Sequence, residues 1–250
     1  SEIDSDALSA SVQGLRISNV HLKNYPLTAD GDDTVALLDG ENNFIEVGLL
    51  STGSAAPTAT TVWNADGNTY TWKNSDDVKF SRSVTIDNYV ITVADTITNN
   101  PGHDVAFAPY ARIVRENNIK SSSGVNNGAI AYVNSDIENI AWNKLDKKSY
   151  AYSTTNGFVG FADQYWETVA SIDSPDQTIR VKKSGDKYIS DAASGAVSVA
   201  SGADAKITTH IFAGPREQSV LDNAEHKITG LSETIDYGWF WLCDRLVKVL

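Results

Sequence analysis

The sequence predicts a mainly β protein, a large antiparallel β-sandwich that ends in two C-terminal α-helices. Three observations carry this prediction. About fifteen short segments rich in β-branched and aromatic residues alternate with turn residues, helical periodicity is not found before Pro215, and it appears after that residue. The 250-residue chain shows no composition shift or repeat. We therefore expect a single domain over residues 1–250, with a β body over 1–214 and a helical segment over 215–250.

The N-terminal part of the chain predicts strands joined by polar turns, because its apolar or alternating runs end at Gly, Asp and Asn residues. The expected strands are 15–22, 35–38, 44–50, 61–63, 69–72, 78–86 and 89–98. Asp66-Gly67 lies between two runs of β-branched and aromatic residues. Such a dipeptide favours a hairpin, because the tight turn needs positive φ. Asp87-Asn88 predicts the next hairpin in the same way.

The middle of the chain continues this pattern up to the Gly214-Pro215 step. Further strands are expected at 105–114, 129–133, 137–142, 178–182, 188–190, 196–200 and 206–213. Residues 158–172 are expected to form either a strand pair or one bent strand. Ser184-Gly185-Asp186 predicts a tight hairpin between two of these strands.

After Pro215 the hydrophobic period changes from that of a strand to that of a helix. Residues 216–227 are predicted to be helical, with Pro215 near the first turn. Val220, Leu221 and Ala224 share one face of this helix, which is expected to face the core.

The terminal stretch from Gly238 to Leu250 predicts a second, amphipathic helix. Its apolar residues recur at offsets of three and four, and they are Trp239, Phe240, Leu242, Cys243, Leu246, Val247 and Leu250. The helix is too short to cross a bilayer, which takes about twenty apolar residues. It either seals the core of the protein or lies along a membrane surface with its aromatic residues at the interface.

Composition excludes several classes of function. The formal net charge is −12 and no run of basic residues occurs, which argues against a nucleic-acid partner. Cys243 is the single cysteine, so no internal disulfide forms. The polar N-terminus carries no signal peptide, and no window approaches eighteen apolar residues. We therefore expect an excised or mature soluble segment of a longer protein.

Motifs for catalysis or metal binding are not found in the sequence. None of the four histidines, His21, His103, His210 and His226, has a second ligand at metal spacing. There is no GxSxG elbow and no Gly-rich phosphate loop. We therefore expect no metal, no cofactor and no catalytic residue.

Two local features leave alternatives open. The acidic cluster at 30–33 lacks the spacing of a calcium loop and favours a solvated turn. Trp63, Tyr70 and Trp72 lie near one predicted hairpin. Aromatic residues on a sheet face either stack on sugars or, more commonly, pack in a core.

Three segments resemble motifs of the large periplasmic domain of YidC, the bacterial membrane protein insertase. Residues 157–166, GFVGFADQYW, resemble a GW-x-G-x-x-x-x-YW segment. Residues 212–217, FAGPRE, resemble a (Y/F)-x-GPK-E step, and residues 235–241, IDYGWFW, resemble (I/V)DYGW-x-W. Weaker similarity occurs earlier, at 22–25 with 35–38 and at 66–71. The matches follow the order of the family across nearly the whole chain.

This resemblance implies a β-supersandwich related to galactose mutarotases, on the periplasmic face of the bacterial inner membrane. It implies a non-catalytic domain of an insertase and chaperone that assists insertion and folding of inner-membrane proteins, alone or with the Sec translocon. The implied partners are Sec translocon components, nascent inner-membrane proteins and the membrane surface. The isolated domain is expected to be monomeric, and residues 215–250 to lead to the next transmembrane helix. An aldose-epimerase-like or sugar-binding sandwich is the alternative.

The resemblance also selects the candidate site residues. The helix expected to face the membrane or a partner presents Tyr237, Trp239, Phe240, Trp241, Leu242, Leu246, Val247 and Leu250. The motif residues expected to have structural roles are Gly157, Tyr165, Trp166, Gly214, Pro215, Asp236 and Gly238.

Overall fold

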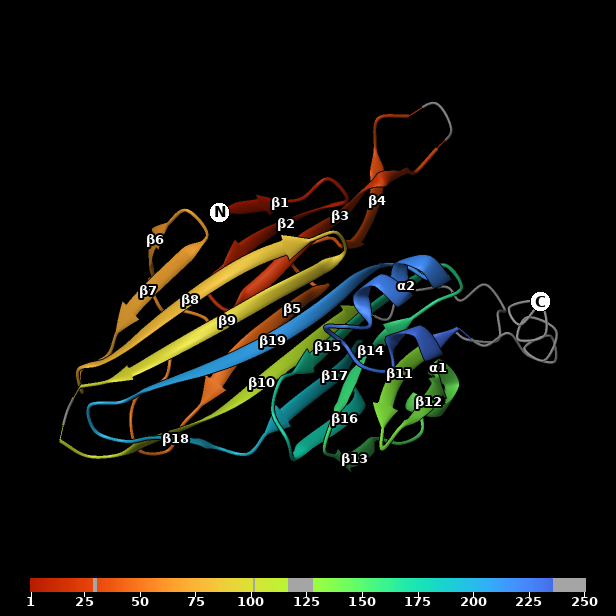
Figure 1. Cartoon of the computed structure of the whole chain (residues 1–250). Helices are drawn as coiled ribbons and strands as arrows, with labels where there is room; N and C mark the ends of the chain where they lie inside the picture. The colour runs from red at the N-terminus through yellow and green to blue at the C-terminus, as the bar shows by residue number, and fades with distance from the viewer. Residues whose placement is uncertain (29–30, 101, 117–127, 236–250) are drawn as a thin grey trace, which may run out of the picture.

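The computed structural model describes residues 1–28, 31–100, 102–116 and 128–235. Two large antiparallel sheets face each other and form a sandwich, with short helical elements at one end (Figure 1). The predicted fold class is thus confirmed as mainly antiparallel β. Within the described ranges, no helix is long and apolar enough to cross a membrane.

Sheet A contains ten strands, all paired antiparallel. Its order is β1 (Glu2–Asp4), β2 (Leu8–Gln13), β3 (Arg16–Pro26), β5 (Phe44–Leu50), β10 (Val105–Glu116), β17 (Lys187–Ser194), β16 (Gln177–Ser184) and β13 (Tyr150–Thr154), with β4 (Thr34–Leu38) beside β3 and β18 (Val197–Val199) beside β10. Neighbours along the chain often pair directly, as β16 does with β17 around Gly185, whose φ is +59°.

Sheet B contains nine strands and carries the elements that lead to the C-terminus. Its order is β12 (Asp136–Ala141), β11 (Gly128–Val133), β14 (Gly157–Ala162), β15 (Trp166–Ile172), β19 (Asp204–Pro215), β9 (Val90–Asn99), β8 (Val78–Asp87), β7 (Thr69–Lys73) and β6 (Asn64–Asp66). Of the two readings left open for residues 158–172, the strand pair β14–β15 is the one observed.

The core lies between the sheets and follows from alternation along the strands. In β9, for example, Ile91, Val93 and Ile97 are buried, while Thr92, Ala94 and Thr96 between them are half-buried. A large cluster of buried residues occupies most of the sandwich, and a smaller one around Phe80 and Phe107 fills the end near β18. Burial of this apolar surface supplies the main driving force for folding.

The C-terminal segment covers part of the outer face of sheet B. It contains α2 (Gln218–Ala224) and a 3-10 helix, η1 (Leu231–Thr234). Phe212 shares a face of β19 with the half-buried His210, yet Phe212 is fully buried. Leu221 and Leu231 are fully buried in the same cluster as Phe212, so the segment hides apolar residues that would otherwise face water.

Gly230 allows the close approach of this segment to the sheet. Its φ is +85°, and a Cβ atom there would lie 2.4 Å from the Tyr132 ring. Any side chain would therefore be strained by the backbone and would collide with the ring. Tyr132 in turn stacks on Phe158 with ring centroids 5.6 Å apart.

Three details of the predicted elements need correction. A short helix, α1 (Trp142–Leu145), precedes Pro215, where no helix was expected. The strand expected at 61–63 is wrong, because β6 begins only at Asn64. Thr61 instead closes a turn, in which its hydroxyl oxygen accepts a hydrogen bond from the backbone N–H of Thr58. The predicted helix over 216–227 is shorter, because Pro215 still belongs to β19 and α2 begins at Gln218.

Candidate interaction site at the root of the C-terminal segment

The motif residues meet where the C-terminal segment leaves sheet B. We call this place the root and define it as Asp163, Tyr165, Trp166, Glu167, Pro215, Arg216 and Thr234. The strands β15 and β19 pair here with Trp166 opposite Pro215 and Glu167 opposite Gly214. The backbone N–H of Arg216 donates to the carbonyl of Tyr165 at 2.8 Å. Two motifs far apart in sequence therefore form one structural unit.

The turn between β14 and β15 is closed by Asp163. Its Oδ1 accepts hydrogen bonds from the backbone N–H groups of Tyr165 and Trp166, at 2.9 and 2.8 Å. A short polar side chain that bonds the backbone two residues ahead is the usual device of such a turn. It fixes the direction in which the two aromatic residues follow the strand.

The motif glycines permit close packing. A Cβ atom at Gly157 would lie 2.4 Å from the carbonyl oxygen of Tyr132, which is backbone and cannot turn away. A Cβ atom at Gly214 would lie 2.9 Å from the Phe212 ring and 3.0 Å from Tyr89. Both positions therefore exclude larger residues for steric reasons.

A buried ion pair joins β15 to the start of the C-terminal segment. Nε of Arg216 lies 3.3 Å from Oε2 of Glu167, and the two side chains are 6% and 0% exposed. The guanidinium also donates to the carbonyls of Asp163, at 2.8 Å, and Thr234. Arg216 thus ties three pieces of chain together: the β14–β15 turn, β15 itself and the end of η1.

Glu167 is the unusual member of this arrangement. Among the described residues, none gives its carboxylate oxygens a well-aligned hydrogen bond. Burial raises the pKa of Glu167 from 4.5 to about 7, and the nearby Arg216 guanidinium and Thr234 hydroxyl offset the rise only in part. The charge of the root therefore changes near neutral pH.

An aromatic cluster borders the root. Tyr25 meets Trp166 edge to face, with ring centroids 5.1 Å apart, and donates its hydroxyl hydrogen to Oε1 of Glu217 at 2.6 Å. Burial and this bond to Glu217 raise the pKa of Tyr25. Tyr165 is 62% exposed, one of few large hydrophobic residues with that much solvent contact in the described ranges. An exposed aromatic residue beside the start of the C-terminal segment is a candidate contact for a partner or a membrane.

Of the predicted site residues, Gly157, Tyr165, Trp166, Gly214 and Pro215 lie in the structure as described above. The others lie outside the described residues, and they are Asp236, Tyr237, Gly238, Trp239, Phe240, Trp241, Leu242, Leu246, Val247 and Leu250. Their assigned roles stay predictions. Ile235, the last described residue, packs against the large core cluster.

Sequence reasoning missed Glu167, Arg216 and Thr234. Each is a common residue in an ordinary polar context, and a buried charge has the same one-letter code as an exposed one. The only signal was position, since Glu167 directly follows the Tyr-Trp motif and Arg216 directly follows Gly-Pro.

The aromatic residues considered for sugar stacking pack inside the protein instead. Tyr70 is 3% exposed within the large core cluster. Trp72 stacks on Phe80 with ring centroids 5.5 Å apart, and Trp63 packs against both clusters. Of the two alternatives for these residues, the structure favours core packing.

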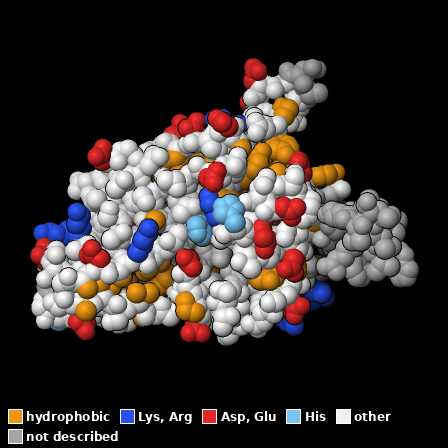
Figure 2. Space-filling view, in the orientation of Figure 1, with side chains coloured by type: hydrophobic (Ala, Val, Ile, Leu, Met, Phe, Trp, Pro, Cys, Tyr) orange, Lys and Arg blue, Asp and Glu red, His pale blue; other side chains and the backbone are white. Residues whose placement is uncertain are grey.

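Two of the four histidines come together although the sequence separates them. His210 in β19 and His226 after α2 line one polar cavity of about 270 Å³, with Asp173 at the end of β15. Figure 2 shows histidine side chains near the centre of this face. In the part of the chain that the structure describes, no group of three or more His, Cys, Asp or Glu side chains is arranged to hold a metal ion.

Comparison with known proteins identifies relatives over the whole chain. The family model described as the YidC periplasmic domain matches residues 1–249. The membrane protein insertase YidC of Granulibacter bethesdensis is 30% identical over 95% of this chain, which covers 47% of that relative. The insertase of Sinorhizobium fredii is 30% identical over 96% of this chain, which covers 45% of that relative. The chain therefore spans about half the length of these relatives.

Solved structures show the same fold at low sequence identity. A galactose mutarotase-like protein from Lactobacillus casei aligns with a TM-score of 0.57 and 11% identity, over 85% of this chain and 99% of that one. A galactose mutarotase related enzyme from Lactobacillus acidophilus aligns with a TM-score of 0.56 and 8% identity, over 85% and 96%. These similarities confirm the galactose-mutarotase-like β-sandwich. The family model that matches residues 1–249 shows that the chain belongs to the family of YidC periplasmic domains.

Proposed function

We propose that this chain is a non-catalytic domain on the periplasmic face of the bacterial inner membrane. It assists the insertion and folding of inner-membrane proteins as part of an insertase, alone or with the Sec translocon. The observation that carries the proposal is the family match over residues 1–249. Because the chain spans about half of its relatives, the insertion step itself is assigned to the whole protein.

The proposed layout places a monomeric β body, residues 1–214, in the periplasm. Residues 215–250 then lead to the next transmembrane helix of the longer protein. The root supports this layout, because Arg216 fixes the start of the segment to β15 through Glu167 and to η1 through Thr234. A rigid root would fix the position of the β body relative to the chain that follows Ile235.

Residues 236–250 carry the proposed contact with the membrane surface or with a partner. Support comes from the aromatic and aliphatic residues of this stretch and from exposed Tyr165 beside the start of the C-terminal segment at Arg216. The contacts expected are with nascent inner-membrane proteins and Sec translocon components.

Site-specific photocrosslinking in the full-length protein tests the insertase role. A photoreactive residue at Tyr165 or Trp239 should crosslink to an inner-membrane protein during its synthesis, or to translocon subunits. The same residue at Lys206 is the control, because it is exposed on β19 nine residues before Pro215, about 30 Å away. Equal crosslinking from all three positions would contradict a specific role for the root end.

Co-sedimentation with vesicles tests the membrane contact separately. The chain should pellet with phosphatidylcholine vesicles, and a variant with Trp239, Phe240 and Trp241 changed to Ser should not. Vesicles containing anionic lipid should bind no better, because the net charge is −12. Binding that survives the triple substitution would remove the terminal stretch from the proposal.

Polarimetry distinguishes the alternative, an aldose epimerase. The observation in its favour is the cavity shared by His210, His226 and Asp173, because epimerisation needs an acid and a base beside one sugar. We expect no acceleration of the mutarotation of freshly dissolved glucose or galactose. Acceleration that is lost in a His210→Ala variant would establish the enzymatic function instead.

A further inference from the structure

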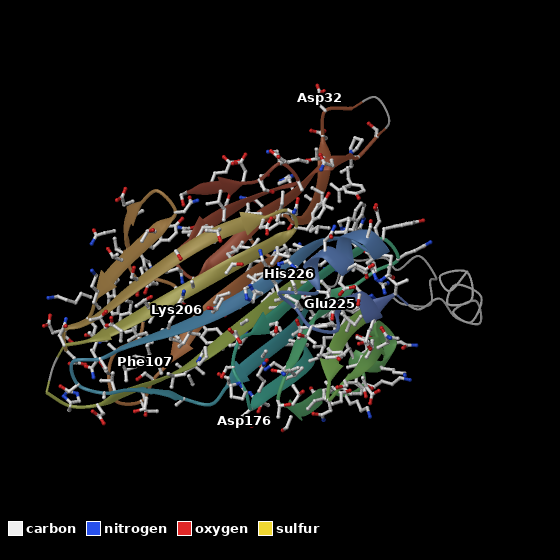
Figure 3. All side chains as sticks on the ribbon, in the orientation of Figure 1. Asp32, Phe107, Asp176, Lys206, Glu225 and His226 are labelled. Carbon is white, nitrogen blue, oxygen red and sulfur yellow. The ribbon has the colours of Figure 1, made fainter. Side chains whose placement is uncertain are left out.

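The polar cavity at the edge of the C-terminal segment has no role in the proposed insertase function. It lies where the chain after α2 crosses the outer face of sheet B, at His226 (Figure 3). Its polar lining comes from four separate pieces of chain and includes Asn156, Asp173, His210, His226, Lys227 and Thr229. At about 270 Å³ it is slightly smaller than the cavities that hold drug-sized ligands, roughly 300 Å³ and above, so it suits a small molecule.

Several lining groups already have protein partners. The His226 Nδ1–H donates to the carbonyl of Asn223 at 2.7 Å, so Nε2 is the ring nitrogen left for a ligand. Nδ1 of His210 lies 3.1 Å from the Thr92 hydroxyl, so Nε2 of His210 is also left for a ligand. Lys227 pairs with Asp87 at 2.8 Å.

Other groups of the lining have no hydrogen-bond partner among the described residues. These are the carboxylate of Asp173, the hydroxyl of Thr229 and the side-chain amide of Asn156, all on exposed residues and therefore open to an incoming ligand. Burial lowers the pKa of His210, with Asp173 opposing the shift, which favours a neutral ring. The cavity therefore offers both hydrogen-bond acceptors and donors. Among its described lining residues, the Asp173 carboxylate is the one charge without an ion-pair partner.

This mixture restricts the chemistry of a ligand. An anion would be repelled by Asp173, and the one ammonium group is already neutralised by Asp87. A metal cation would need a cluster of ligands that the described residues do not form. Hydroxyl groups both donate and accept, and so match carboxylate, imidazole, amide and hydroxyl partners together. Ile172 and Gly157 add an apolar wall for C–H groups.

We propose that this cavity binds a small neutral ligand with several hydroxyl groups, of the size of a monosaccharide. Asp173 accepts hydrogen bonds from two adjacent hydroxyls, and the Nε2 atoms of His210 and His226 hydrogen-bond to others. The ligand contacts both the sheet, through Asp173 and His210, and the C-terminal segment, through His226 and Thr229. Binding therefore holds that segment against the sandwich, by the mass action of a ligand that prefers the docked state.

Titration of the chain with a panel of small molecules tests the inference, with binding followed by calorimetry and by NMR. The panel comprises glucose, galactose, mannose and inositol, with glucose 6-phosphate and glucosamine as charged counterparts. At least one neutral compound should bind more tightly than either charged one. An Asp173→Asn variant should weaken that binding about tenfold or more, as expected for loss of hydrogen bonds to a charged group. Asp173 is exposed, so the substitution should leave the fold intact.

The matched control is Asp186→Asn, because Asp186 is also exposed but lies in the β16–β17 turn away from the cavity. It should bind as the original chain does. The bound ligand should also slow amide hydrogen exchange at residues 226–231. No binding by any neutral compound at tens of millimolar, tighter binding of the phosphate, or equal loss in both variants would overturn the inference. The ligand-binding inference does not depend on the insertase role, which the crosslinking experiment tests separately.

Discussion

Sheet B contains two buried pairs of arginine and carboxylate that differ in how they are satisfied. In the first, Nε and Nη2 of Arg82 each lie 2.8 Å from an oxygen of Asp95, directly opposite on the next strand. The remaining nitrogen, Nη1, donates to the carbonyl of Gly14 at 3.1 Å. In the second, Arg216 gives two of its nitrogens to backbone carbonyls and meets Glu167 only at 3.3 Å.

The difference shows what each pair contributes. The Arg82–Asp95 pair has bidentate geometry and links β8 and β9 to the β2–β3 turn of the other sheet, so it serves the sandwich. The Arg216–Glu167 pair leaves its carboxylate poorly bonded, with a raised pKa, and holds the C-terminal segment that covers part of sheet B. The first pair therefore stabilises the sandwich itself, whereas the charge of the second pair changes with pH near neutrality.

The largest expected effect comes from breaking the first pair. Asp95→Ala leaves the Arg82 guanidinium buried without its counter-charge, which costs about 3–5 kcal/mol of unfolding free energy. Urea denaturation measures the loss. The matched control is Asp4→Ala, which removes a pair with Lys23 whose side chains are 66% and 39% exposed and should cost under about 1 kcal/mol. Similar losses in both variants would contradict the importance of burial here.

The second effect is a pH dependence specific to Glu167. Its pKa in the folded state is about 7 against 4.5 in the unfolded chain, so between these values the folded state binds more protons. The stability from this group is fully present below pH 4.5 and is lost as pH rises toward 7, by about 3 kcal/mol. Urea midpoints across this range should fall more steeply for the original chain than for Glu167→Gln. Parallel curves would show that Glu167 titrates normally.

A smaller effect on stability should distinguish Arg216 from Arg82. Arg216→Lys keeps the charge but loses the planar fork that reaches both carbonyls and Glu167, at a cost of about 1–2 kcal/mol. Amide hydrogen exchange should rise at residues 231–235, where η1 depends on the bond to Thr234. Arg82→Lys is the comparison, and it should leave exchange in η1 unchanged. If both substitutions speed exchange there equally, the root is not a separate unit.

The smallest effect concerns the aromatic border of the root. Tyr25→Phe removes the hydrogen bond to Glu217 but keeps the edge-to-face contact with Trp166. Because the bond is solvent-exposed, the expected loss is about 1 kcal/mol or less. Thermal unfolding of Tyr25→Phe beside Tyr25→Ala measures it, and the alanine variant should lose more because the ring packing goes too. Equal losses would assign the whole contribution to the hydroxyl.

Prediction from sequence succeeded where the structure depends on local pattern. Strand β5 has the predicted bounds, and β8 and β9 differ from prediction by a residue at their ends. Four-residue α1 is shorter than the window over which helical period can be recognised. Strand β13, at a sheet edge, has only half-buried apolar residues and was not predicted. Weak periodicity explains these two misses. Strands β1 and β2 were also not predicted, although β2 alternates buried Leu8, Ala10 and Val12 with more polar residues.

The candidate site was predicted only in part. Tyr165, Trp166, Gly214 and Pro215 were selected by resemblance to family motifs, and the structure places them side by side. The sequence contained no sign that Glu167 is buried beside Arg216, or that His210 and His226 share a cavity. These pairs are separated by 49 and 16 positions, and nothing in the local pattern of either residue encodes its distant neighbour.

The sequence by itself determined the β-sandwich class, the change of period after Pro215 and the family. Alternation, turn dipeptides and short motifs are local properties of the chain, and they do not depend on which strands become neighbours. Only the tertiary structure decided which charges are buried, which aromatic residues pack in the core and where polar groups from distant strands surround a cavity. The pKa of Glu167 depends on water being excluded by η1 and Arg216, and that exclusion exists only once the C-terminal segment lies on sheet B.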